Sequence, residues 1–238
     1  MINLQDLAEP AILSSFAFLI FVLLLVYFAS RKVLKENWLK FFLIILFVLL
    51  AWFFTVAFFG KTGFISKSYY WLFIPNLAIA FLILFHFLRK AYYSEKIRKI
   101  ADAIPQHWII GIQFYRVVGV GFIILYFQGS LPALFAFSAG IGDIIVGITA
   151  PFVALACYLK KSYSKNLAVA WNILGILDLV IAISVGILGF PRPVQFLPLY
   201  PSTEPISLFP LVMVPLFAVP IAIILHLFSL RGLRKGNV

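Results

Sequence analysis

Charged side chains are scarce in this chain of 238 residues. Asp, Glu, Lys and Arg make up 11% of it, whereas an ordinary soluble domain carries about a quarter. Hydrophobic residues account for 64%, against about half in a soluble domain. The composition excludes a soluble catalytic domain, a dinucleotide-binding fold and a DNA reader, and it predicts an integral membrane protein.

Cysteine is nearly absent, since Cys157 is the single one. A disulfide framework and a CxxC metal site are therefore excluded, and we predict no metal site. The interior of the long apolar stretches also holds no lysine. A retinal Schiff base, which needs a lysine nucleophile inside the bundle, is excluded for that reason.

Apolar residues gather in stretches long enough to cross a bilayer, which takes about 20 residues in a helix. Seven such stretches leave only short loops, so we expect an all-α, multi-pass protein that forms one membrane domain (1–238) in a plasma or inner membrane. The expected spans are 11–29, 38–60, 71–88, 108–127, 131–159, 167–190 and 206–230.

Basic residues predict the orientation, because they favour the cytoplasmic side. Of the 19 Lys and Arg residues, 15 fall in alternate loops and in the C-terminal tail. We therefore expect the N-terminus outside and the C-terminus in the cytoplasm. The net charge of +11 then reflects attraction to anionic lipid and not to nucleic acid. The 15 residues are Arg31, Lys32, Lys35, Lys40, Arg89, Lys90, Lys96, Arg98, Lys99, Lys160, Lys161, Lys165, Arg231, Arg234 and Lys235.

The loop 91–107 has the pattern of a short amphipathic helix. Ile97, Ile100 and Ile104 recur at helical spacing, and Lys96 lies on the other face. This pattern predicts a helix lying on the cytoplasmic leaflet. A regulatory docking site is the alternative.

Three ionisable residues fall inside predicted spans, where an unpaired charge costs several kcal/mol. Counted at 1.5 Å per residue, Arg116 lies about 12 Å and Asp178 about 16 Å from the cytoplasmic ends of their spans, and Asp143 reaches a similar depth. Stripes of small residues point both aspartates into the bundle. We predict an Arg116–Asp143–Asp178 cluster, with Gln113 and Asn172 as neutral hydrogen-bond partners.

Two interpretations of this cluster stay open. It is either a structural ion pair that fixes helix register, or a solute or proton site. The last span adds a second transporter-like feature, because Pro210, Pro215 and Pro220 interrupt it. Broken helices often line substrate sites, although a bent helix packed by its neighbours has the same sequence pattern.

Spans three and seven share four residue types at a constant offset. A 3+1+3 parallel repeat, with the fourth span as linker, follows from this match. The paired residues are Pro75 with Pro215, Ala78 with Ala218, Ile83 with Ile223, and His86 with His226.

The layout of seven spans with an outside N-terminus resembles the SWEET sugar transporters in topology but not in motifs, because their Pro-Gln signatures within helices are absent. The stretches 131–151, 171–178 and 215–226 resemble uncharacterised polytopic bacterial membrane proteins. That resemblance covers the C-terminal half and implies no activity.

Two further chemistries were weighed for the polar residues of these spans. Gly140, Gly142 and Asp143 match the GxGD motif of intramembrane aspartyl proteases, with Asp178 as second carboxylate. In presenilin-like enzymes, however, the other aspartate precedes the motif. His86 and His226, at matching repeat positions, have the residue type of axial ligands to haem b.

The leading hypothesis is a small-solute or proton-coupled transporter that contacts membrane lipid and is not an enzyme. The main alternative is a haem-binding or accessory subunit of a membrane complex, and the intramembrane protease is a third. The other expected partner of the protein is a second copy of the chain or a partner subunit.

Overall fold

The structure is a computed structural model, and it describes residues 8–63, 82–83, 85–86, 89–90, 93–191 and 196–236. In these ranges all regular structure is helical and no strand occurs. The predicted all-α class is confirmed. Long apolar helices with few turns between them leave no room for a separate soluble domain among the described residues.

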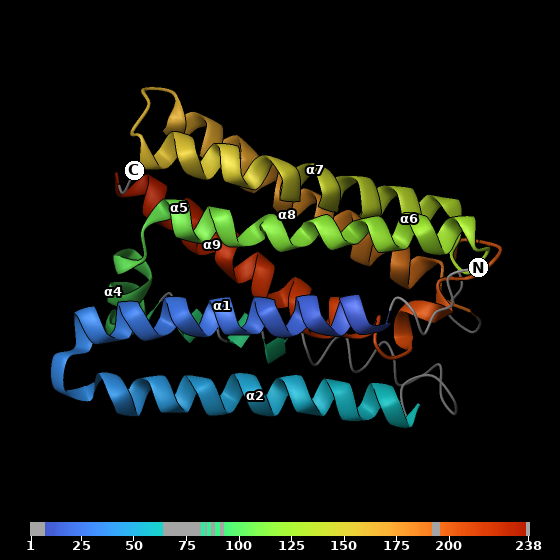
Figure 1. The fold of residues 1–238 in the computed structure, drawn as a ribbon, viewed down its shortest axis with the longest axis horizontal. Coiled ribbons are helices and arrows are strands. Elements are labelled where there is room, and N and C mark those ends of the chain that lie inside the picture. The colour runs from blue at the N-terminus through green and yellow to red at the C-terminus, as the bar shows by residue number, and fades with distance from the viewer. Residues whose placement is uncertain are drawn as a thin grey trace.

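The helices follow the apolar stretches of the sequence, and short 3-10 or π segments interrupt them (Figure 1). The elements are α1 (Ala8–Leu34), η1 (Lys35–Asn37), α2 (Trp38–Thr62), α4 (Glu95–Ala103), α5 (Gln106–Gly111), η2 (Ile112–Gly119), α6 (Val120–Phe127), α7 (Ala133–Tyr158), α8 (Ser164–Leu188), η3 (Glu204–Ser207), η4 (Val214–Ala218) and α9 (Val219–Arg234).

The described residues contain five candidate membrane spans, not the seven predicted. The first candidate, Ile12–Thr62, is a helical segment of 51 residues that includes both predicted spans 11–29 and 38–60. The sequence break between them is only η1, a single 3-10 turn, and α1 and α2 fold back on each other there. Most of the predicted span 71–88 lies outside the described residues. The chain is therefore a multi-pass membrane protein with five candidate spans.

The other four candidates overlap the last four predicted spans; the ends of the first three differ from the prediction by at most three residues, whereas the last is shifted toward the C-terminus. They are Gln106–Phe127, Ala133–Tyr158, Ser164–Leu188 and Val214–Arg234. The last begins at Val214 and not at 206, because the residues before it form η3 and turns. Around Pro215 the backbone is a π-helix, so this proline interrupts the α-helical geometry of the span, whereas Pro210 precedes the span and Pro220 lies within the α-helix α9.

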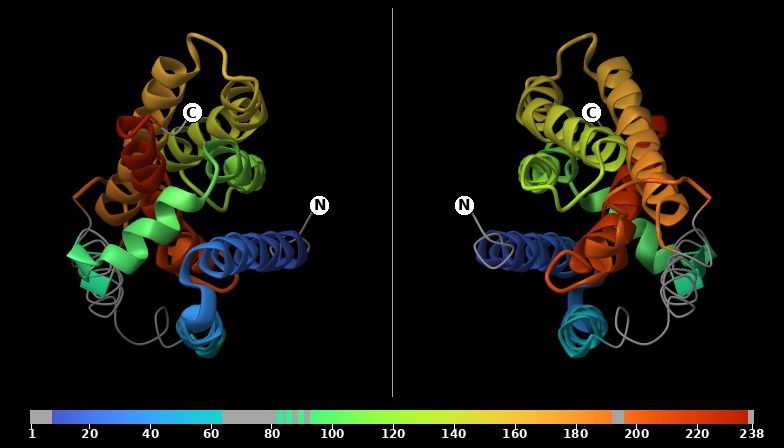
Figure 2. Two further views of the ribbon diagram at one scale, coloured as in Figure 1. Left: turned by 90° about the vertical axis from the view of Figure 1, so that its left-hand side faces the viewer. Right: turned by 90° about the vertical axis from the view of Figure 1, so that its right-hand side faces the viewer.

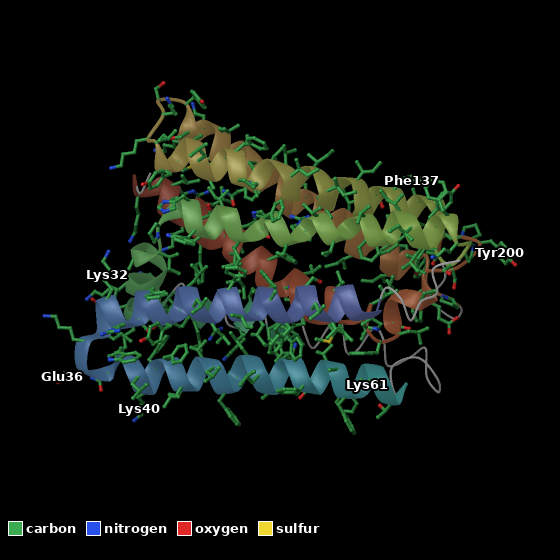
Figure 3. The ribbon with its side chains drawn as sticks, viewed as in Figure 1. Lys32, Glu36, Lys40, Lys61, Phe137 and Tyr200 are labelled. Carbon is green, nitrogen blue, oxygen red and sulfur yellow. The ribbon has the colours of Figure 1, made fainter. Side chains whose placement is uncertain are left out.

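Two views at right angles show how the helices are grouped (Figure 2). Helices α5 to α9 form one bundle, and α1 lies against its η2 side, with α2 packed on the outside of α1. The N- and C-terminal ends of the described chain lie at opposite ends of the bundle (Figure 1). Lys32, Glu36 and Lys40 gather at the end that holds α4, whereas Lys61 lies at the other end (Figure 3).

A helix is present in the predicted amphipathic loop 91–107, namely α4. Its side chains Ile100 and Ile104 are buried, and α4 packs on α1 and α9. Asp102 on the same helix binds Arg231 and Lys235 at the end of α9, at 3.2 and 2.5 Å. The apolar face of α4 thus covers the end of the bundle. Its contact with a lipid leaflet stays a prediction.

Candidate functional site

The segment η2 carries the arginine of the predicted cluster on its buried face. In a 3-10 helix, residues three apart in the sequence lie directly above one another. Gln113, Arg116 and Gly119 are spaced in this way, and all three are buried. The local 3-10 geometry therefore aligns the amide, the guanidinium and the small residue in one row toward the interior.

Glycines on α7 allow η2 to approach closely on both sides of Asp143. A Cβ at Gly147 would lie 2.7 Å from the backbone nitrogen of Val117, and one at Gly140 would lie 3.0 Å from the carbonyl oxygen of Gly119. Such distances leave no room for a side chain. The small-residue stripe of α7 thus brings the backbone of η2 within reach of Asp143.

Arg116 binds both aspartates of the predicted cluster. Its Nε donates to Oδ1 of Asp143 at 2.7 Å, and its Nη2 donates to Oδ2 of Asp178. The Arg116 side chain is 1% exposed, and those of Asp143 and Asp178 are 14% and 11% exposed. One guanidinium faces two carboxylates here. With all three ionised, the cluster has a net charge of −1.

His226 on α9 completes the surroundings of the guanidinium. Nη1 of Arg116 lies 3.3 Å from Nε2 of His226 and donates to the carbonyl oxygen of Gly175 at 3.4 Å. A Cβ at Gly175 would collide with the imidazole ring, so this glycine makes room for His226. Since arginine can only donate, Nε2 accepts and the proton of the ring is on Nδ1.

A buried chain of polar side chains continues from His226 toward the start of α5. Nδ1 of His226 donates to Oδ1 of Asn172 at 2.9 Å, and Nδ2 of Asn172 donates to Oγ of Ser229 at 2.9 Å. Ser229 in turn donates to Oε1 of Gln106 at 2.8 Å. These side chains fix the relative positions of α5, α8 and α9 around Arg116.

Gln113 does not join this network. Its Nε2 donates to the carbonyl oxygen of Ala222 at 3.4 Å, and its Oε1 is the one buried side-chain oxygen or nitrogen without a hydrogen-bond partner in the described part of the chain. Gln113 was predicted to be a hydrogen-bond partner of the cluster, but its hydrogen bond goes to the backbone of α9 and not to Asp143 or Asp178.

A cavity of about 290 Å³ adjoins the cluster. Arg116 and Asp143 form its charged wall, and apolar side chains of η2, α6, α8 and α9 form most of the rest. A second, smaller cavity of about 40 Å³, with α7 and α8 in its lining, also reaches Asp143. Asp143 is thus the carboxylate that faces open space.

The structure brings the predicted residues together unequally. Arg116, Asp143 and Asp178 are in direct contact, and Asn172 reaches Arg116 only through His226.

His86 is exposed, whereas His226 is 1% exposed and uses both ring nitrogens in the network. The two histidines proposed as a haem pair therefore lie in unlike surroundings. No group of three or more His, Cys, Asp or Glu that could hold a metal occurs in the part of the chain described.

Sequence reasoning did not identify His226, Ser229 and Gln106 as partners of the cluster. The spacing of His226 and Ser229, three residues apart on one helix face, was the available signal. Their partner Asn172 lies on the buried face of α8, which the stripe of small residues does indicate.

The family comparison covers the part of the chain that holds every residue of this network. No curated protein and no solved structure matches the chain. The topological resemblance to SWEET transporters therefore stays a prediction. A family model described as "Domain of unknown function (DUF8737)" matches residues 72–234, more than half of the sequence, so the chain belongs to the DUF8737 family.

Proposed function

We propose that the protein is a membrane transporter for a small solute, coupled to protons, with Asp143 and Asp178 as its carboxylates and Arg116 as their counter-charge. The observation that carries the proposal is a cluster with one excess carboxylate at the wall of a cavity of about 290 Å³. A purely structural ion pair needs neither an excess charge nor adjacent open space. An unpaired charge at membrane depth costs several kcal/mol, and an ionisable residue there is a functional-site hypothesis by default.

Interrupted helices on two sides of the cavity support the same function. Arg116 belongs to the 3-10 segment η2, and Val214 and Ala218 of the π-helix η4 also line the cavity. Segments that leave α-helical geometry in mid-span often mark hinges or binding sites, because their backbone can be rearranged at low cost.

The proposal includes the orientation inferred from the basic residues, with the C-terminus in the cytoplasm. The end of the bundle that holds α4 also holds Lys32 and Lys40 (Figure 3), and Arg231 and Lys235 lie near Asp102 there. The plasma or inner membrane is the proposed location; what supports membrane insertion is the set of five candidate spans among the described residues.

The alternatives fit the geometry less well. Haem ligation requires a ring nitrogen that His226 already uses toward Arg116 or Asn172. In an aspartyl protease, two carboxyl groups share a proton, whereas Asp143 and Asp178 both bind one guanidinium. An accessory subunit would favour a small-residue face toward lipid, but Gly140 and Gly147 face η2.

The test is solute-linked proton movement in liposomes that contain the purified full-length protein and a pH-sensitive dye in the lumen. A panel of neutral, anionic and cationic small solutes is added outside. We expect at least one solute to change the internal pH with wild type, and the change to fall at least tenfold with Asp143→Asn. Asp102→Asn is the matched control, because Asp102 is also paired with cations but lies far from the cavity lining.

Two outcomes would contradict the proposal. The first is a full panel without any solute-linked change in internal pH, with folded protein in the liposomes. The second is a change that persists undiminished in the double variant Asp143→Asn/Asp178→Asn. In either case the cluster would be structural.

A further inference from the structure

The cavity beside the cluster has one charged end and otherwise apolar walls. Arg116 and Asp143 form the charged end, and the hydroxyl-bearing residues Ser14, Ser15 and Tyr115 lie elsewhere on the lining. The apolar part comes mainly from α6, α8, η4 and the start of α9, with side chains that include Phe122, Leu125, Leu179, Leu211 and Val219. A solute that fills this space must therefore carry a small polar group and a hydrocarbon part.

The donors at the polar end are mostly taken. Nε, Nη1 and Nη2 of Arg116 already donate to Asp143, Gly175 and Asp178, and Nη1 also contacts His226. Four of the five N–H groups of the guanidinium are thus engaged. An anionic headgroup would have to compete with these partners for Arg116.

Asp143 keeps one oxygen available. Its Oδ1 accepts from Arg116, and Oδ2 has no hydrogen-bond partner in the portion of the chain that is described. Gly119 lines the cavity at this point, and a Cβ there would lie 3.1 Å from Oδ2. The missing side chain at Gly119 thus lets the Asp143 side chain pack against the backbone of η2 at the edge of the cavity.

Charge selects the headgroup. The cluster carries two carboxylates and one guanidinium, so a monovalent cation would make it neutral and an anion would raise its net charge to −2. A primary ammonium meets both requirements, because it carries one positive charge and three N–H donors for Oδ2 of Asp143.

The size of the cavity limits the hydrocarbon part. An apolar cavity of about 150 Å³ accommodates benzene. The cavity here, at about 290 Å³, has room for a short alkyl chain or one aromatic ring with its headgroup. A larger groove of about 660 Å³, lined by α1, α5, η2 and α7, shares Ser14 and Tyr115 with this cavity and so lies directly beside it.

We propose that this cavity is the binding site of a hydrophobic primary ammonium, held by Oδ2 of Asp143 at its charged end with its alkyl or aryl part against the apolar walls. The inference rests on the proposed transport function and names its substrate class.

The test is equilibrium dialysis of radiolabelled n-hexylammonium against the full-length protein in lipid nanodiscs, with empty nanodiscs as background. Unlabelled n-hexylammonium, n-hexanol and n-hexanoate serve as competitors. We expect n-hexylammonium to compete at least tenfold better than n-hexanol, and n-hexanoate not to compete. Equal competition by all three would overturn the proposal, because only apolar contact would then be involved.

Two variants and two matched controls locate the site. Asp143→Asn removes the charge at nearly constant shape, and Val214→Phe fills the cavity; each should weaken n-hexylammonium binding at least tenfold. Asp102→Asn and Val180→Phe, the second on the exposed face of α8, should leave binding unchanged. If Asp143→Asn fails to fold, the affinity of Val214→Phe for n-hexylammonium tests the proposal by itself. Wild-type affinity in a folded Val214→Phe protein would overturn the proposal.

The two proposals can fail separately. Binding of n-hexylammonium without any proton movement in liposomes would contradict transport and keep the ammonium site. Proton movement driven by an anionic or neutral solute, with no binding of n-hexylammonium, would contradict the ammonium site and keep transport.

Discussion

Arg116 and His226 lie 3.3 Å apart, measured from Nη1 to Nε2, although 110 positions separate them in the sequence. The contact joins η2 to α9, and it fixes the imidazole in the tautomer with the proton on Nδ1, which donates to Asn172. Because the guanidinium occupies Nε2, the ring cannot take up a second proton without losing this contact. His226 is thus a neutral link between the ion cluster and the polar chain.

Removal of the imidazole should destabilise the protein. His226→Phe keeps the ring volume but leaves Nη1 of Arg116 and Oδ1 of Asn172 with one partner fewer. A buried group that loses its partner costs about 1–3 kcal/mol, so we expect a loss of about 2–4 kcal/mol. Reversible unfolding in mixed micelles measures this loss of unfolding free energy. Replacement of the exposed His86 by Phe is the control and should change stability by less than about 0.5 kcal/mol.

Loss of the guanidinium should be more severe than loss of either carboxylate. Arg116→Met leaves two carboxylates without a cation, and the cost of breaking a buried pair in this way is about 3–5 kcal/mol. The triple variant Arg116→Met/Asp143→Asn/Asp178→Asn should recover much of the loss, because no unpaired charge remains. Unfolding of wild type, Arg116→Met, Asp143→Asn, Asp178→Asn and the triple variant side by side tests this. A triple variant no more stable than Arg116→Met would contradict the charge argument.

Much of this site could be predicted from the sequence, because the bilayer makes its polar residues conspicuous. Three ionisable residues at one depth had to meet, and the small-residue stripes showed which faces turn inward. The all-α class and the last four spans followed from length and hydropathy.

Other features depended on backbone geometry that the sequence pattern does not reveal. The last span was predicted to end at residue 230, but α9 continues to Arg234, so His226 lies near the middle of the helix. The separation of the first two spans depended on the short break at Lys35–Asn37, which the structure forms as one 3-10 turn. The role of Gln113 was inferred from a shared face with Arg116, yet a shared face does not decide which partner an amide finds.

The unpartnered oxygen of Gln113 leads to an unusual expectation for a buried polar residue. Gln113→Leu removes an unsatisfied acceptor and one long hydrogen bond, so it should be neutral or stabilising by up to about 1 kcal/mol. Asn172→Leu is the matched comparison, because the nitrogen and the oxygen of the Asn172 amide both form hydrogen bonds. This variant should lose about 2–4 kcal/mol of stability. Chemical denaturation of both variants measures the difference. Equal losses would mean that Gln113 has a partner in solution.

The close approach of α7 to η2 should make Gly147 intolerant of a methyl group. Gly147→Ala places Cβ 2.7 Å from the backbone nitrogen of Val117, which cannot move aside as a flexible side chain can. Overpacking of this kind costs about 1–3 kcal/mol. Gly121→Ala is the control, since nothing lies within 4 Å of its Cβ, and it should be neutral or slightly stabilising. A Gly147→Ala protein as stable as Gly121→Ala would contradict the close packing.

The ion pairs of Asp102 should make the attachment of α4 dependent on pH. Burial raises the pKa of the Asp102 carboxyl, but its hydrogen bonds with Lys235 and Arg231 outweigh burial and hold the pKa below the usual value of 3.8. A lowered folded-state pKa contributes stability that is fully present above the unfolded value and is lost as the pH falls through the folded value. Asp102→Asn should therefore be less stable than wild type by about 1 kcal/mol at pH 7. Thermal unfolding between pH 7 and pH 2 should show this difference shrinking below about pH 4, where wild-type Asp102 becomes protonated. A difference that stays constant down to pH 2 would mean that the carboxylate charge does not hold α4 to α9.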